Sequence, residues 1–176
     1  IVDSIQQNDV INSIEIIRVG KFAKKFNAPK VFETELENVA FKEKEYLEKL
    51  ETLKVAYLKD KGIDKATETA SGLKILELKK GTGKKFNRAI VASMIYSVSL
   101  ASGKLIQSTE GKDPFEFTLD KQPMIAGVTE ALLEMREGDK NRLFIPYYLG
   151  YGEETYGPFP QKSDIVFDVE LIKVGK

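Results

Sequence analysis

The sequence predicts an α+β protein in which an antiparallel five-stranded sheet is half-wrapped around one short helix, with a long helix on the N-terminal side. Apolar residues recur at spacings of three and four between residues 32 and 62, which is typical of an amphipathic helix. Beyond residue 72 the period becomes two in several short runs, with one helical stretch among them. Strands grouped in this way favour α+β architecture over a parallel sheet.

Residues 1–20 indicate a short polar turn and then a strand over about residues 11–19, ended by Gly20. A lone strand needs a sheet to join. We expect either an orphan strand or an N-terminal arm that packs on the rest of the chain. The chain starts without an initiator Met or a charged, apolar leader, so we expect a fragment or a processed product.

Part of this segment resembles the last turn and strand of bacterial cyclophilins. The residues that carry the resemblance are Ile1-Val2-Asp3-Ser4-Ile5, Asn8-Asp9-Val10-Ile11 and Ile14-Glu15-Ile16-Ile17-Arg18-Val19-Gly20. The resemblance implies that residues 1–20 are the remnant of an upstream domain.

Residues 21–31 are predicted to be a basic linker, and residues 32–62 a long amphipathic helix that Thr34 caps and Gly62 ends. Its apolar face contains Leu36, Val39, Ala40, Leu47, Leu50, Leu53, Tyr57 and Leu58. Because exposed stripes of this size are rarely left in water, the helix predicts a homodimer through residues 32–62. The alternative is that it folds back over the C-terminal domain.

Residues 63–71 are polar and Thr-rich, which predicts a second linker, and residues 72–176 form the predicted domain. Its strand candidates cover residues 73–78, 90–100, 114–119, 141–145 and 164–174, and its helix covers residues 126–135. Gly-containing turns separate these elements.

Composition excludes several classes of function. The chain has no Cys and no His, so it has no disulfide, no Cys nucleophile, no imidazole or thiolate metal site and no Ser-His-Asp triad. Its 27 basic and 27 acidic side chains balance, which argues against nucleic acid as a partner. No run approaches the ~18 apolar residues of a membrane span, so we expect a soluble chain with no membrane insertion. The absence of Cys leaves the compartment open between the bacterial cytoplasm and the periplasm. No motif predicts a cofactor.

Aromatic and apolar residues are dense in residues 72–176 although no catalytic group accompanies them. The order of the following segments resembles an FKBP-type peptidyl-prolyl cis-trans isomerase domain over about residues 70–174: Ser71-Gly72-Leu73-Lys74, Gly81-Thr82-Gly83, Tyr96, Gly103-Lys104, Pro114-Phe115-Glu116-Phe117, Gly127 with Glu130-Ala131-Leu132, Met135 with Glu137-Gly138, Ile145-Pro146, Tyr151-Gly152 and Ile165-Val166-Phe167-Asp168-Val169-Glu170-Leu171. The long helix before this domain is similar to that of the dimeric macrophage-infectivity-potentiator subgroup.

The resemblance implies an isomerase of protein folding that acts on proline-containing peptides and unfolded proteins. Rotating an Xaa-Pro bond meets a barrier of ~18 to 20 kcal/mol but needs no covalent intermediate, in keeping with the missing nucleophiles. The alternative is a peptide-binding or chaperone module that has kept the fold with little turnover.

By position, the resemblance assigns Tyr96, Phe117 and Phe167 to the pocket walls, Phe115 to the mouth, and Met124 and Ile125 to the rim. The Ile125 N–H and the Tyr151 hydroxyl would hold substrate carbonyls. Phe159, in the loop after Tyr151, is assigned to substrate binding.

Three positions depart from the family pattern. Ile106 replaces an aromatic wall, Gln107 replaces an acid and Val128 replaces the Trp that often forms the floor. We therefore expect a wider, more neutral pocket, weak isomerase activity and poor binding of macrolides.

Overall fold

The computed structural model describes residues 10, 15, 17 and 19–175. The chain divides into two compact units, Ile1–Glu45 and Tyr46–Lys176. Most of the predicted strand at residues 11–19 lies outside the described residues, so that strand and the cyclophilin resemblance stay predictions. Among the described residues no helix is long and apolar enough to cross a membrane.

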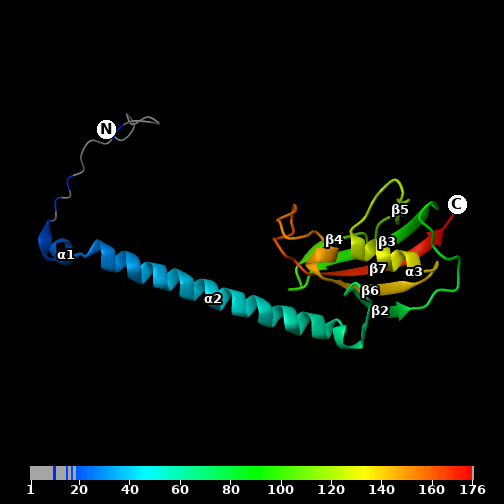
Figure 1. Cartoon of the computed structure of the whole chain (residues 1–176), viewed down its shortest axis with the longest axis horizontal. Helices are drawn as coiled ribbons and strands as arrows, with labels where there is room; N and C mark the ends of the chain where they lie inside the picture. Colours follow the sequence, from blue (N-terminus) through cyan, green and yellow to red (C-terminus); the bar gives the residue numbers. More distant parts are fainter. Residues whose placement is uncertain (1–9, 11–14, 16, 18, 176) are drawn as a thin grey trace. The chain divides into compact units, whose positions relative to one another are not determined.

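Two helices precede the sheet (Figure 1). Helix α1 (Gly20–Lys25) lies at the predicted linker, where no helix was expected. Helix α2 (Ala28–Asp60) starts four residues before the predicted boundary. The reason is that the side chain of Asn27, not Thr34, caps it, accepting a hydrogen bond of 3.2 Å from the Lys30 N–H. Thr34 Oγ1 instead donates to the Lys30 carbonyl within the helix.

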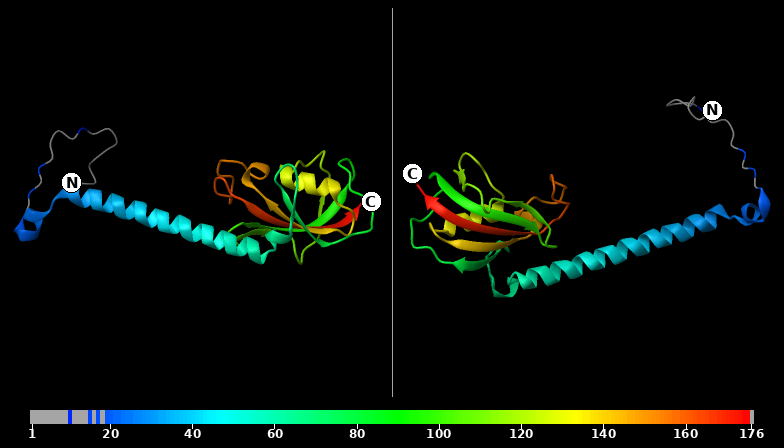
Figure 2. Two further views of the ribbon diagram at one scale, coloured as in Figure 1. Left: turned by 60° about the horizontal axis from the view of Figure 1, so that its bottom comes forward. Right: turned by 180° about the vertical axis from the view of Figure 1, so that it is seen from behind.

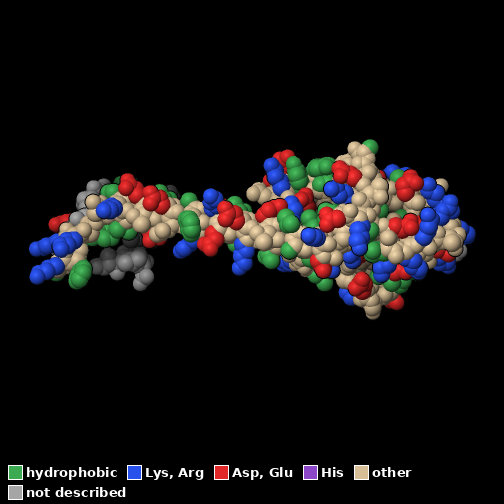
Figure 3. Space-filling view, turned by 90° about the horizontal axis from the view of Figure 1, so that it is seen from below, with side chains coloured by type: hydrophobic (Ala, Val, Ile, Leu, Met, Phe, Trp, Pro, Cys, Tyr) green, Lys and Arg blue, Asp and Glu red, His purple; other side chains and the backbone are tan. Residues whose placement is uncertain are grey.

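Helix α2 ends at Asp60, and Gly62 just beyond it adopts the left-handed conformation with φ of +84°, where the chain turns. None of the α2 residues, all of which the structure describes, is buried. Figure 3 shows apolar side chains in green among Lys and Glu along this helix.

The described residues form one antiparallel sheet with strand order β1-β2-β6-β7-β3-β4, and β5 also pairs with β3. The strands are β1 (Thr67–Glu68), β2 (Lys74–Lys79), β3 (Ala92–Leu100), β4 (Leu105–Ser108), β5 (Phe115–Phe117), β6 (Lys140–Ile145) and β7 (Ile165–Val174). The α+β class is thus confirmed, with seven strands rather than five. Strands β1 and β4 were missed because two and four residues are too few to show a period of two.

Helix α3 (Ala126–Glu134) lies against one face of the sheet, which curves around it (Figure 2). Gly127 permits this close approach, because a Cβ there would lie 2.7 Å from the Ile145 Cγ2. The core between helix and sheet includes Leu73, Met94, Val128, Leu132, Leu143, Ile145, Ile165, Val169 and Leu171, all no more than 2% exposed.

Candidate active site

A cavity of about 530 Å³ opens where the sheet, the start of α3 and the loop after β6 converge. It is mostly apolar, and its lining comes from segments far apart in the sequence. The lining residues are Met94, Tyr96, Val98, Gln107, Phe115, Gln122, Pro123, Met124, Ile125, Val128, Tyr151, Tyr156 and Phe167.

One wall is built on the paired strands β3 and β7. Met94, Tyr96 and Val98 alternate along β3 and therefore share the face that meets the cavity. The Tyr96 ring stacks on the Phe167 ring of β7, with centroids 5.3 Å apart and planes 6° from parallel. Phe167 is 7% exposed, so this wall is continuous with the core.

Gln107, on β4, lines the cavity beside Tyr96. Its Nε2 donates a hydrogen bond of 2.8 Å to the Tyr96 hydroxyl oxygen. An amide, which carries no charge, therefore contacts the Tyr96 hydroxyl where the family pattern has an acid. Ile106, its neighbour, packs half-buried against the core and is not among the lining residues.

Phe115 and Phe117, both on β5, differ in position. Phe115 is 36% exposed at the mouth and meets Tyr96 edge-on, with ring centroids 5.9 Å apart. Phe117 is 2% exposed and packs on Phe86 at 5.5 Å. Phe117 thus supports the wall from the core instead of lining the cavity.

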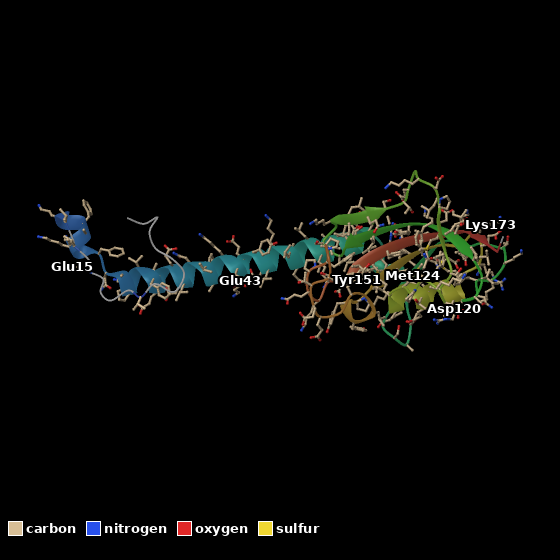
Figure 4. All side chains as sticks on the ribbon, turned by 90° about the horizontal axis from the view of Figure 1, so that it is seen from above. Glu15, Glu43, Asp120, Met124, Tyr151 and Lys173 are labelled. Atoms are coloured by element: carbon tan, nitrogen blue, oxygen red, sulfur yellow. The ribbon has the colours of Figure 1, made fainter. Side chains whose placement is uncertain are left out.

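The start of α3 forms the rim and the floor. Ile125 is the N-cap residue, and no hydrogen bond with another described residue uses its N–H. This N–H lies at the positive end of the helix dipole and is suited to a carbonyl oxygen. Met124 stands at the rim (Figure 4), and Val128, 1% exposed, forms the floor.

The opposite wall is a stack of three aromatic rings in the loop after β6. The Tyr151 ring lies between Phe159, at 3.9 Å, and Tyr156, at 5.2 Å between centroids. Phe159 is 5% exposed and lies behind Tyr151, outside the lining, whereas Tyr156 is 64% exposed and lines the cavity. Tyr156 and Phe159 also exchange two main-chain hydrogen bonds, of 2.9 and 3.0 Å.

The Tyr151 hydroxyl is suited to donate a hydrogen bond. Burial raises the pKa of Tyr151 above its usual value of 10.0, with smaller contributions from Tyr156 and Tyr96. The hydroxyl therefore keeps its proton at neutral pH. No described residue forms a hydrogen bond with it, which leaves it available to a ligand in the cavity.

The resemblance missed five lining residues. Met94 and Val98 could have been found from the sequence, because they alternate with Tyr96. Gln122, Pro123 and Tyr156 lie in loops, where no periodicity indicates which way a side chain points. Among the residues that the structure describes, no group of acidic side chains could hold a metal ion.

A mostly apolar, aromatic cavity with two available hydrogen-bond donors suits the rotation of a prolyl amide. A sequence model described as FKBP-type peptidyl-prolyl cis-trans isomerase matches residues 83–172, half of the chain. The chain belongs to this family. FKBP-type homologues accordingly support peptidyl-prolyl cis-trans isomerase function for this FKBP chain.

Two curated relatives illustrate the extent of the similarity. The peptidyl-prolyl cis-trans isomerase FKBP15-3 of Arabidopsis thaliana is 39% identical over 115 residues, which cover 64% of this chain and 80% of that protein. The FKBP-type isomerase FkpA of Escherichia coli is 34% identical over 134 residues, 76% of this chain but only 45% of that protein.

Solved structures agree with the fold. A peptidyl-prolyl cis-trans isomerase from Pseudomonas syringae aligns with a TM-score of 0.59 at 31% identity and covers 74% of this chain and 93% of its own. The crystal structure of FkpA from Escherichia coli aligns with a TM-score of 0.61 at 26% identity and covers 88% of this chain and 76% of its own. Both alignments extend beyond the residues that the family model matches.

Proposed function

We propose that this FKBP chain rotates Xaa-Pro bonds of peptides and unfolded proteins in the cavity between Tyr96 and Tyr151. The observation that carries the proposal is the pairing, at one cavity, of an apolar floor with two donors that no described residue uses, the Ile125 N–H and the Tyr151 hydroxyl. The prolyl ring would lie over Val128, and the flanking carbonyls would meet these donors.

The physical reason for catalysis is differential binding. The twisted amide has lost its charge separation, so an apolar pocket favours it over the planar, more polar amide. Donors that hold the neighbouring carbonyls keep the bond in the twisted geometry. Each ~1.4 kcal/mol of preference for the twisted state raises the rate tenfold.

We expect the activity to be weak. Gln107 in place of the acid and Val128 in place of an indole leave a cavity that grips a prolyl ring less closely. Looser packing lowers both binding and the preference for the twisted amide.

A protease-coupled isomerisation assay on a panel of Xaa-Pro peptides tests the proposal. We expect measurable turnover that falls about fivefold in Tyr151→Phe, because one hydroxyl hydrogen bond contributes about 1 kcal/mol. Tyr148→Phe, on the same loop but outside the lining, is the matched control and should not change the rate. Absence of turnover together with suppression of client aggregation would support the peptide-binding or chaperone alternative instead.

We also propose that α2 forms a homodimer. Apolar residues along it follow the spacing of four and three of a coiled-coil seam, at Phe32, Leu36, Val39, Tyr46, Leu50 and Leu53, with Glu43 as an interruption. Leu50 is half-buried, and the other five apolar side chains are 47 to 64% exposed. A second copy of the helix would cover them.

Light scattering on the full chain, at concentrations on the order of tens of micromolar, tests the dimer. We expect a dimer for the native chain and a monomer for the paired variant Leu36→Glu and Val39→Glu. Val55→Glu, an equally exposed position off the seam, should stay dimeric. A native chain that runs as a monomer would exclude this proposal.

A further inference from the structure

The last turns of α2 are tied to the sheet domain by side-chain contacts within the unit Tyr46–Lys176. Lys54 Nζ pairs with Asp164 Oδ2 at 2.8 Å. The Tyr57 hydroxyl donates to Ser99 Oγ at 3.2 Å, and Arg142 Nη1 donates at 3.1 Å to the carbonyl of Lys61, the residue after the helix. No step of the proposed isomerisation uses α2 directly, so the contacts of α2 with the sheet domain need another explanation.

Asp164 is the contact that leads toward the cavity. Its second oxygen, Oδ1, accepts a hydrogen bond of 2.9 Å from the Tyr147 N–H. The two oxygens of one carboxylate therefore join the helix to the start of η3 (Tyr147–Leu149), the short helix before Tyr151. Asp164 also lines a small hollow of about 170 Å³ with Leu58 and Pro146. In this partly apolar setting the position of a charged partner matters more than it would in open water.

The Tyr147 carbonyl then holds both neighbours of Tyr151. It accepts hydrogen bonds from the Gly150 N–H, at 3.0 Å, and from the Gly152 N–H, at 2.9 Å. One residue, Tyr147, thus donates its N–H to Asp164, while its carbonyl accepts hydrogen bonds from the residues on both sides of Tyr151. A shift of Asp164 would be passed to the Tyr151 hydroxyl through these hydrogen bonds.

We propose that Lys54 is a positioning residue for Tyr151, acting through Asp164 and the Tyr147 main chain. Helix α2 would then set the geometry of the loop that carries Tyr151, in addition to forming the proposed homodimer. The proposal rests on the proposed isomerase function, because it assigns Tyr151 a role in turnover. Lys54 and Asp164 are both about one-third exposed, so the pair is accessible to substitution without exposing core.

The test uses the full chain with Lys54→Met, which removes the charge and keeps the length of the side chain. Lys54→Arg should restore the pair, and Lys59→Met, at an exposed position on the same helix, removes an equal charge as the matched control. We expect Lys54→Met to lower kcat/KM by about two- to fivefold, the size expected from a part-buried ion pair. Lys54→Arg and Lys59→Met should both match the native chain.

Two further measurements separate positioning from a general loss of structure. Amide hydrogen exchange at Gly150 and Gly152 should speed up in Lys54→Met while exchange in β7 stays unchanged. In a Tyr151→Phe background the further loss caused by Lys54→Met should disappear, since both changes act through one hydroxyl.

Unchanged exchange at both glycines would overturn the proposal, as would equal effects of Lys54→Met and Lys59→Met, or full additivity of Lys54→Met with Tyr151→Phe. If the native chain shows no turnover, the proposed function fails, but the exchange measurement still tests the link from Lys54 to the loop.

Discussion

The two walls of the cavity are held by different kinds of structure. On the sheet side, Tyr96 and Phe167 lie on strands β3 and β7, which pair along nine residues of β3. On the loop side, Tyr151 depends on turn hydrogen bonds to the Tyr147 carbonyl and on stacking between Phe159 and Tyr156. Substitutions in the sheet wall should therefore cost stability, whereas substitutions in the loop wall should mainly change turnover.

The largest expected effect compares two buried phenylalanines, one from each wall. Phe167→Ala should lower the free energy of unfolding by about 3 to 5 kcal/mol, because the sheet cannot collapse into the space left by the ring. Phe159 is about as buried, at 5% exposed against 7% for Phe167. Phe159→Ala should nevertheless lower the free energy of unfolding by less, because the loop that carries Phe159 can move inward to fill the space. Urea denaturation measures both. Equal losses would contradict the distinction between the walls.

The paired substitution Gln107→Asp and Val128→Trp tests how far the residues on the sheet and helix side of the cavity limit substrate binding and turnover. An indole at residue 128 would fill the floor of the cavity, so we expect kcat/KM to rise several-fold, at a stability cost of about 1 to 3 kcal/mol. Steady-state kinetics on one Xaa-Pro peptide measures the change. An unaltered rate would mean that these positions do not set the pocket.

Tyr156→Ala addresses the exposed end of the loop stack. Its ring is 64% exposed, so stability should change by less than about 1 kcal/mol. Losing the stack on Tyr151 should lower kcat/KM by about two- to threefold, within the range that aromatic pairs contribute. A melting curve and kinetics on the same sample separate the two effects. A large loss of stability would mean that the loop wall is as rigid as the sheet wall.

The smallest expected effect is that of pH. With no His in the chain and the pKa of Tyr151 raised above 10.0 by burial, the loop should keep its donor, and kcat/KM should be flat from about pH 6 to 9. Because the folded pKa exceeds the unfolded one, the stability that Tyr151 contributes is full below the unfolded value and is lost as pH rises through the folded value. A transition near neutral pH would show that another group controls the loop.

The sequence by itself determined most of the strands and helices that carry the cavity, but not β4, which carries Gln107. The period of two predicted the strand that carries Tyr96, although Met94 and Val98 were not assigned to the site, and apolar spacing identified α2 and α3. These patterns are local, because backbone geometry alone makes residues two apart in a strand, or three and four apart in a helix, share a face. Resemblance to the FKBP family added the position of Tyr151.

Tertiary structure alone decided what each face meets. Phe115 and Phe117 lie two residues apart on β5 and therefore share a face, yet Phe115 lies at the mouth and Phe117 in the core. The reason is that β5 pairs with only the first part of β3. Two further features depend on how the chain folds back on itself: the stack of Phe159 and Tyr156 on Tyr151, and the ion pair of Lys54 with Asp164. The local spacing of apolar residues does not predict such contacts. Loops have no repeating geometry, so the direction of their side chains follows from the packing around them.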